Sequence, residues 1–347
     1  MDELEKARAT VALLRRRVDE LPAELTRAKL APLPELPAAA RDAGIWIVSG
    51  IGASEGPARL LVAELASAGV AAIFHPVTSF LGDTAPQGAV LVVVSQRLSP
   101  NARLPLRHRG RYRATILVTT LDPAVDEQAR ALAAHGVCVV VHGPVAEDGL
   151  LLRVQGPAVA NLMVLRLALA VRIAQSLPKP AWASALDGFA PHAAEHEALP
   201  RDALFDPIAF VACGEDVSLA CGLRHKLLEG LGSGEPHIWD GCGIVHGPLQ
   251  SFYERRQLLV ALLRTGDEPS LGVFGRLEKV LDPTRHRMLV LKATLPGPLA
   301  LFELDLALDA LLVAALEGRP RDLGNWPGKG VDAPIYELDG EHPPDRR

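Results

Sequence analysis

The stretch 44-GIWIVSGIGASEG-56 decides the fold class of this chain. Its first part, Gly44 to Val48, is a short apolar run with β-branched residues, typical of a parallel strand buried on both faces. Its second part, Ser49 to Gly56, is a glycine-rich turn, and a helical pattern that proline is suited to begin follows over 57–69. Strand, glycine-rich turn and helix in this order predict the opening unit of an α/β domain.

The same alternation continues on both sides of a polar, proline-rich segment at 178–207. Before this segment we predict strands over 71–74, 89–94, 115–119 and 137–141, and helices over 125–135 and 159–175. After it we predict strands over 208–213, near Ile238, over 271–274 and over 287–292, and helices over 217–231, from Gly247 and over 299–316. Two units of similar size and order indicate a diverged internal duplication. The expected fold is α/β, with two similar three-layer α/β/α lobes on flavodoxin-like parallel sheets.

The rest of the chain flanks these two lobes. Apolar positions at helical spacing between Leu4 and Leu21 predict an N-terminal helix, and a proline-rich connector follows it. We therefore expect a helix and connector over 1–39, a first lobe over 40–178, a linker over 179–205, a second lobe over 206–318 and a tail over 319–347. Glycine and proline are frequent over 326–330, so we expect the tail to be a loop that folds over a cleft.

The composition argues against several classes of protein. The chain has 347 residues, 49% of them hydrophobic and 22% charged, which does not fit a disordered chain. A net charge of −5 and an aromatic content of 4% argue against a nucleic-acid partner. The charged N-terminus lacks the apolar core of a signal peptide, and no apolar run reaches the roughly 18 residues of a membrane span. We expect a cytoplasmic protein without a nucleic-acid or membrane partner.

The four cysteines fit neither a metal-binding pair nor a disulfide framework, so we expect no metal site. The glycine-rich turn does offer hydrogen-bond donors, namely backbone N–H groups and a hydroxyl. Gly50, Gly52 and Ser54 precede a helix and form a natural site for an anion. A dinucleotide fingerprint would need a further glycine shortly after Gly52 and an acid near the end of the next strand, where His75 stands instead. A tight turn without a ligand is the other alternative.

A second polar turn follows the predicted strand at 89–94. The carboxyl ends of parallel strands meet at one edge of a sheet, where open α/β sheets bind ligands. We therefore predict one binding pocket at this edge, formed by Gly52, Ser54, Ser95, Gln96, Arg97, Ser99 and Asn101. The alternative is an ordinary turn in which Ser99 caps the following helix.

At this point the chain resembles the sugar isomerase (SIS) family of phosphosugar-binding domains. The resemblance covers about residues 40 to 335 and is to the tandem arrangement in the isomerase half of glucosamine-6-phosphate synthase. Residues 50–54 resemble the glycine-rich turn of the family, and Ser95-Gln96 resembles the start of its Ser-Gln-Ser-Gly-Glu-Thr phosphate loop. Residues 245–249 resemble its His-Gly-Pro-Leu motif. Residues 320–323 with Lys329 resemble its Pro-Arg-Asn-Leu-Ala-Lys tail.

The resemblance implies an enzyme that isomerises, deaminates or deglycates a phosphorylated sugar through an enediol or an imine. It assigns Glu229 to the proton transfer between C1 and C2, His246 to ring opening, and Lys329 to contact with the substrate, as an imine in the synthase. It implies no cofactor, and a homodimer in which a second subunit completes the cleft. Residues 1–39 hold no glutamine-hydrolysing domain.

The chain departs from the family pattern in three places. Arg97-Leu98-Ser99-Pro100 replaces Ser-Gly-Glu-Thr, which exchanges hydroxyls for a guanidinium. The interval from Glu229 to His246 is one residue longer, and residues 324–328 are inserted before Lys329. The altered loop at Arg97 favours an alternative, a non-catalytic sensor of a sugar phosphate or another anion. The alternatives are a solvated charge for Glu229, a helix N-terminal cap or a core histidine for His246, and an exposed tail residue for Lys329. A nicotinamide-dependent oxidoreductase is the third possibility.

Overall fold

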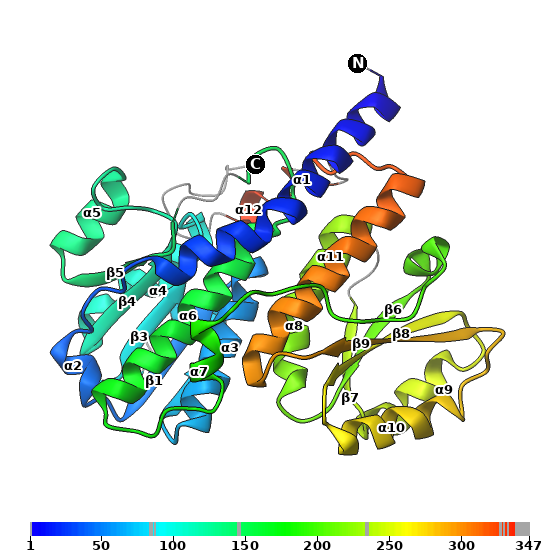
Figure 1. Ribbon diagram of the computed structural model, residues 1–347. Coiled ribbons are helices and arrows are strands. Elements are labelled where there is room, and N and C mark those ends of the chain that lie inside the picture. The colour runs from blue at the N-terminus through cyan, green and yellow to red at the C-terminus, as the bar shows by residue number, and fades with distance from the viewer. Residues whose placement is uncertain are drawn as a thin grey trace. The chain divides into compact units, whose positions relative to one another are not determined.

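The computed structural model describes residues 2–82, 86, 88–143, 147–232, 236–325, 328, 330–331 and 333–336. The chain forms two compact units, each built on a parallel sheet (Figure 1). The unit we call the first lobe comprises Ala23–Glu147, Gln155–Pro180 and Trp326–Arg347. The second lobe comprises Met1–Pro22, Asp148–Val154 and Ala181–Asn325. The expected α/β class with two parallel-sheet lobes is confirmed.

The sheet of the first lobe has five parallel strands in the order β2-β1-β3-β4-β5. The strands are β1 (Ile45–Gly50), β2 (Ala71–Phe74), β3 (Val90–Val94), β4 (Ala114–Thr119) and β5 (Val137–Val141). The helices of this part of the chain are α2 (Ala38–Arg41), α3 (Glu55–Ser67), α4 (Leu104–Arg107), α5 (Glu127–Ala134), α6 (Gln155–Ala174) and α12 (Ala333–Tyr336).

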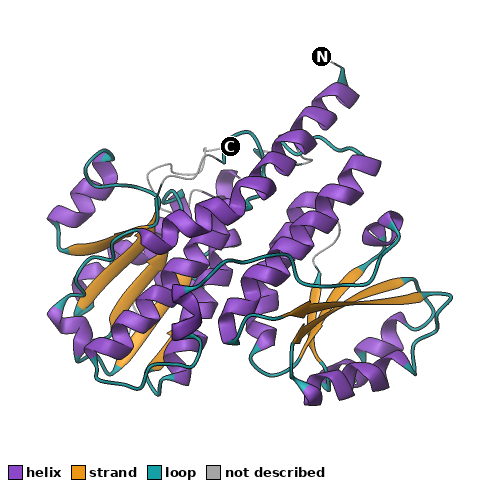
Figure 2. Ribbon diagram, in the orientation of Figure 1, coloured by secondary structure: helices purple, strands orange, loops and turns teal. Residues whose placement is uncertain are grey.

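The central strands of this sheet are largely apolar along their length and are therefore buried. All residues of β3 are buried, and Ile47, Leu91 and Leu117 on one face pack with Phe80 and Tyr112 in a single core cluster. A strand that is apolar throughout can be covered on both faces, which is why these short runs form central parallel strands. Figure 2 shows helices around the strands of this lobe.

The sheet of the second lobe has four parallel strands in the order β7-β6-β8-β9. The strands are β6 (Ile208–Ala212), β7 (His237–Asp240), β8 (Gln257–Arg264) and β9 (His286–Ala293). The helices of this part of the chain are α7 (Ala183–Asp187), α8 (Asp216–Leu231), α9 (Pro248–Phe252), α10 (Glu268–Glu278) and α11 (Ala300–Gly318). Its strand order matches that of the first four strands of the other sheet, as a duplication would produce.

Two of the expected elements differ in the structure. The strand expected over 271–274 is wrong, because these residues lie inside α10, where the Asp267 side chain accepts a hydrogen bond from the N–H of Ser270 and caps the helix. The strand that actually pairs with β6 and β9 is β8, which sequence reasoning missed. The N-terminal helix α1 (Glu3–Leu30) continues beyond Leu21 and contains Pro22.

The segment expected as a linker, 179–205, belongs to the second lobe from Ala181 onward. It contains α7, and Glu195 forms an antiparallel bridge with Lys292 of β9. The helix α6 is long and apolar enough to cross a membrane, contrary to the expected absence of such a run. However, 67% of its most apolar window is buried inside the protein, as in the core helix of a soluble domain.

Candidate functional site

The two glycine- and serine-containing turns lie at one edge of the first sheet. Strands β1 and β3 are parallel neighbours, and Gly50 at the end of β1 pairs with Val94 at the end of β3. The chain leaves β1 toward β2 on one side and enters β3 on the other, so the strand order reverses between them. In open α/β sheets this reversal opens a crevice in which ligands bind.

The turn after β1 depends on two glycines. A Cβ atom at Gly50 would lie 2.4 Å from the carbonyl oxygen of Ser54, and Gly52 has a φ of +59°. The chain then enters α3 directly, and the side chain of Ser54 makes no capping bond to that helix. Arg59 pairs with Glu55 at 2.7 Å, which offsets the negative charge at the start of α3. An anion can therefore approach the half-buried Ser54 at a helix N-terminus.

The turn after β3 is held by its own side chains. The buried Ser95 hydroxyl accepts a hydrogen bond from the N–H of Leu98 at 3.0 Å. Leu98 has a φ of +49°, a conformation that L side chains rarely adopt, and its side chain is buried in the core. Leu98 therefore occupies a left-handed backbone position that glycine usually fills.

Gln96 is held between β4 and α6. Its backbone carbonyl accepts hydrogen bonds from the hydroxyls of Thr119 and Thr120 at 3.0 and 2.7 Å. Its Nε2 donates to Glu147 at 3.2 Å. A Cβ atom at Gly156 would lie 2.4 Å from this Nε2, so glycine is needed beside it. The Gln96 amide therefore packs against the start of α6.

Glu147 is a functional candidate that sequence reasoning missed. It is fully buried, and its carboxylate accepts the backbone N–H groups of Gln155 and Gly156 at 2.8 and 2.9 Å. A carboxylate at a helix N-terminus is stabilised by these unpaired N–H groups and by the helix dipole. An acid several residues before a helix that begins with Gln-Gly-Pro was the only signal in the sequence.

The other residues expected in this pocket differ in their exposure. Arg97 is exposed and Ser99 is half-buried, and the side chain of Ser99 makes no capping bond to the following turn. Asn101 is buried, and its Nδ2 donates to the carbonyl oxygen of Ile335 in α12 at 2.7 Å. Gly52 is exposed. Ser95, Gln96 and Asn101 thus have partners inside the lobe, whereas Gly52, Ser54, Arg97 and Ser99 are the more accessible group.

The residues expected in catalysis belong to the second lobe and the tail. Glu229 is half-buried near the C-terminal end of α8, which stops at Gly232 with a φ of 57°. His246 is exposed in the loop before α9, where the N–H of Gly247 donates to Gln250 Oε1 at 3.0 Å. Lys329 lies outside the described residues. Helix α8 runs from the carboxyl end of β6 to the amino end of β7. Glu229 therefore lies toward the amino ends of the strands, whereas the loop that carries His246 follows the carboxyl end of β7.

Among the groups whose pKa is shifted, His142, Asp216 and Lys226 are buried. Burial lowers the pKa of His142, directly after β5, to about 4, and neither ring nitrogen has a hydrogen-bond partner among the described residues. Burial raises the pKa of Asp216 at the start of α8 to about 6, although Arg264 lies 3.2 Å away. Lys226 is buried, but Asp305 and Asp309 outweigh the effect of burial and raise its pKa.

Comparisons with known proteins show the fold. No protein-family model and no curated protein matches the chain. Among solved structures, it is similar to the C-terminal domain of glucosamine-fructose-6-phosphate aminotransferase from Francisella tularensis, with a TM-score of 0.64, 12% identity, and 87% of this chain and 94% of that chain covered. It is also similar to glucosamine-6-phosphate deaminase from Thermotoga maritima, with a TM-score of 0.64, 15% identity and coverages of 90% and 97%.

A third similar structure is tagatose-6-phosphate ketose/aldose isomerase from Escherichia coli, with a TM-score of 0.58, 15% identity and coverages of 92% and 93%. The match extends over nearly the whole length of each of these proteins. At such low identity it is the arrangement of strands and helices that is shared. The chain therefore has the two-lobed SIS-type α/β fold found in these sugar-phosphate proteins.

Proposed function

We propose that this chain is an enzyme that isomerises or deaminates a phosphorylated sugar. The observation that carries the proposal is the pair of turns at the reversal of strand order in the first sheet, where Ser54 and Ser95 leave adjacent strands. Exposed Arg97 adds a positive charge to this edge. Solved proteins of the same fold bear the names of a sugar-phosphate aminotransferase, a deaminase and an isomerase, which supports this class of substrate.

In this proposal the phosphate of the sugar lies at the N-terminus of α3, against Gly52, Ser54, Arg97 and Ser99. Backbone N–H groups and hydroxyls at a helix start bind a phosphate dianion well. Glu229 then moves the proton between C1 and C2 through an enediol, and His246 exchanges a proton with the ring oxygen. Lys329 engages the carbonyl carbon, as an imine if the reaction is a deamination.

Ligand binding is tested first by thermal shift with a panel of sugar phosphates. A ligand at about 100 times its Kd should raise the free energy of unfolding by about 2.7 kcal/mol. The sugar without its phosphate and inorganic phosphate alone serve as controls. A panel that gives no shift with any sugar phosphate would contradict the proposal.

Catalysis is tested with the sugar that binds best. Solvent deuterium should enter C1 or C2 during turnover, because an enediol exchanges its carbon-bound proton with the medium. Glu229→Gln should remove turnover and leave the thermal shift in place. Glu278→Gln, an exposed carboxylate at the end of α10, is the matched control and should keep full activity.

A non-catalytic sensor of a sugar phosphate or another anion is the second candidate, and one observation favours it. Ser95, Gln96 and Asn101 already make hydrogen bonds within the lobe, so fewer groups remain for the ligand than the SIS-type loop offers. A sensor would bind the sugar phosphate and show neither turnover nor deuterium exchange, and Glu229→Gln would change nothing. Either protein would act, in our proposal, as a cytoplasmic homodimer, which sedimentation can test.

A further inference from the structure

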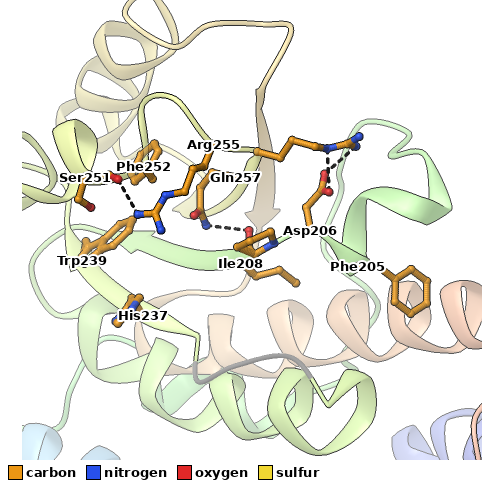
Figure 3. Close-up of a pocket in the computed structure, with 11 residues that line it drawn as sticks. Phe205, Asp206, Ile208, His237, Trp239, Ser251, Phe252, Arg255 and Gln257 are labelled. Carbon is orange, nitrogen blue, oxygen red and sulfur yellow. Dashed lines mark hydrogen bonds and ion pairs between the residues drawn. The ribbon is translucent and has the colours of Figure 1, made fainter.

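A cavity of about 620 Å³ lies within the second lobe, at the amino ends of β6, β7 and β8 (Figure 3). Its walls come from residues directly before or at the start of these strands, Pro207, Ile208, His237 and Gln257, and from α9. The volume lies within the usual range for small-molecule sites. This cavity belongs to a different sheet, and to the opposite end of the strands, from the turns discussed above.

One wall of the cavity is a ladder of aromatic rings. Trp239 stacks on His237 with 5.6 Å between ring centroids and 9° between planes, and on Phe252 with 5.5 Å and 13°. Phe252 is buried and fixes the inner end of the ladder, whereas His237 is exposed and forms its outer end. Because His237 is exposed, a further flat ring can extend the stack at this end. The ladder is therefore a platform for a planar group.

A second wall presents an acceptor with a fixed orientation. Gln257 is only 7% exposed, and its Nε2 donates to the carbonyl oxygens of Pro207 and Leu258 at 2.8 and 3.2 Å. These two bonds fix which end of the amide is nitrogen. Its Oε1 has no partner among the described residues and is not one of their buried polar atoms, so it is open to an incoming donor. A donor on a bound molecule would satisfy it.

Two arginines line the cavity, and one of them is available to bind an anion. Arg256 is neutralised by Asp206, with Nε–Oδ1 and Nη2–Oδ2 distances of 2.9 and 3.0 Å. Arg255 donates only from Nη2, to the carbonyl oxygen of Ser251, so its Nε and Nη1 have no partner in the described part of the chain. Arg255 lines the same cavity as the rings of Trp239 and His237, and Figure 3 labels all three residues.

We propose that this cavity binds a small anion carried on a flat unsaturated ring, with at least one hydrogen-bond donor. The ring stacks on the His237 end of the ladder, the anionic group accepts from Nε and Nη1 of Arg255, and the donor reaches Oε1 of Gln257. Aromatic carboxylates and nucleoside monophosphates share this chemistry. The inference stands apart from the sugar-phosphate site and holds whether or not the chain is an enzyme.

The test is calorimetric titration of the full chain with matched pairs of probes. 4-Hydroxybenzoate and 4-hydroxycyclohexanecarboxylate carry the same acid and hydroxyl, but only the first is flat. Adenosine monophosphate and ribose 5-phosphate form the second pair, and inorganic phosphate is tested alone. The flat member of at least one pair should bind roughly two- to tenfold more tightly, as expected for one added ring contact. The pair that responds distinguishes the carboxylate from the nucleotide.

Variants then locate the site. Arg255→Gln should weaken binding of the flat probe about tenfold or more, because it removes charge-assisted hydrogen bonds. His237→Ala should abolish the preference for the flat member of the pair. Arg276→Gln, which removes an exposed arginine of α10 in the same lobe, is the control and should bind as the wild type does. Arg255 and His237 are exposed, so both variants should fold, which circular dichroism checks.

Three results would overturn the proposal. In the first, no flat probe binds, or inorganic phosphate binds as well as the ring compounds. In the second, binding persists unchanged in Arg255→Gln. In the third, Arg255→Gln alters the sedimenting mass of the protein and not its affinity for the probes, which would make the cavity an interface between protein chains.

Discussion

Glu147 joins the turn after β3 to the start of α6 through a single buried carboxylate. Its two oxygens accept from Gln155, Gly156 and Gln96, so replacing one oxygen by an amide nitrogen places a donor against donors. Glu147→Gln also removes the charge that complements the N-terminus of α6. We expect a loss of about 1–3 kcal/mol in the free energy of unfolding, measured by urea denaturation.

Exposed Glu278 supplies the comparison for this experiment. Glu278→Gln removes one carboxylate from a helix end without opening a buried site, and surface changes of this kind usually alter stability by less than about 0.5 kcal/mol. If the two variants unfold at the same urea concentration, the network around Glu147 contributes nothing to stability and does not hold Gln96 in place.

Asp216 makes the stability of the protein depend on pH in a direction unusual for an aspartate. Burial raises its pKa in the folded protein to about 6, above the value of about 3.9 in an unfolded chain. Between these two values the folded form holds more protons than the unfolded form, so the contribution of this group to stability falls as pH rises. Between pH 4 and pH 7 the fall is no more than about 3 kcal/mol.

The measurement is the unfolding free energy of the wild type minus that of Asp216→Asn at a series of pH values. Asparagine cannot ionise, so the difference isolates the titration of Asp216, and the ion pair with Arg264 adds only a partial offset. We expect the difference to decline from pH 4 to pH 7. A difference that rises over this interval would mean that the ion pair outweighs burial and that the pKa is lowered instead.

The positions of Ser54 and Ser95 at one sheet edge could be predicted from the sequence, but their partners could not. The edge follows from strand order, which the alternation of strands and helices constrains. The partner of Gln96 is Glu147, 51 residues further along the chain, and no local pattern connects the two. The sequence therefore predicts where a pocket lies and not which of its side chains are already in use. Their role in binding stays a prediction.

The misassigned elements of the second lobe show where periodicity fails. Strand β8 reads Gln-Leu-Leu-Val-Ala-Leu-Leu-Arg, and leucine and alanine favour a helix as much as a buried strand. Helix α10 contains Gly272, Val273, Phe274 and Gly275, which favour a strand or a turn. Burial in the core settles both, because β8 is buried along nearly its whole length and α10 packs Phe274 and Leu277 beneath the sheet. Tertiary packing overrides local propensity here.

Helices α8 and α11 are joined by a buried ionic cluster. Lys226 of α8 donates to Asp305 and Asp309 of α11, each at 2.7 Å, and all three side chains are at most 5% exposed. Removing the charge of Lys226 leaves two buried carboxylates without a counter-ion. The resulting loss of stability is far larger than the net stabilisation that the ion pairs provide.

Lys226→Met keeps the length and apolar stem of the side chain and removes its charge. We expect a loss of about 3–5 kcal/mol in the free energy of unfolding at neutral pH, measured by chemical denaturation. Lys279→Met, at an exposed position after α10, should change stability little. An equal effect of the two substitutions would show that the cluster does not join these helices.

The two sheets share one strand order, but different residues lie where that order reverses. In the first sheet the order reverses between β1 and β3, beside Gly52, Ser54 and Arg97, which suit an anion. In the second it reverses between β6 and β8, beside Asp216 and Arg264, which pair with each other. A duplication followed by divergence explains why the sequence shows two similar units but only one glycine-rich turn of the anion-binding kind.

The positions of the proposed catalytic residues bear on whether one active site is formed by one chain or by two. Glu229 lies near the C-terminal end of α8, on the amino side of the sheet, and His246 follows the carboxyl end of β7. Two groups at opposite ends of the strands of one sheet can act on one sugar only if they come from different copies of the chain. If the chain forms a two-fold homodimer, each active site then takes Glu229 from one subunit and His246 from its partner.

Mixed dimers of two inactive variants provide the measurement. Glu229→Gln and His246→Asn should each be inactive alone, but a heterodimer of the two concentrates both substitutions in one site and leaves the other intact. Co-expression in equal amounts should restore about a quarter of the wild-type activity, since half of the dimers are mixed and each holds one intact site. Mass spectrometry of the native dimers confirms mixing. Mixed dimers without activity would place both residues in the same chain's site, whereas single variants that keep their activity would place these residues outside the chemistry.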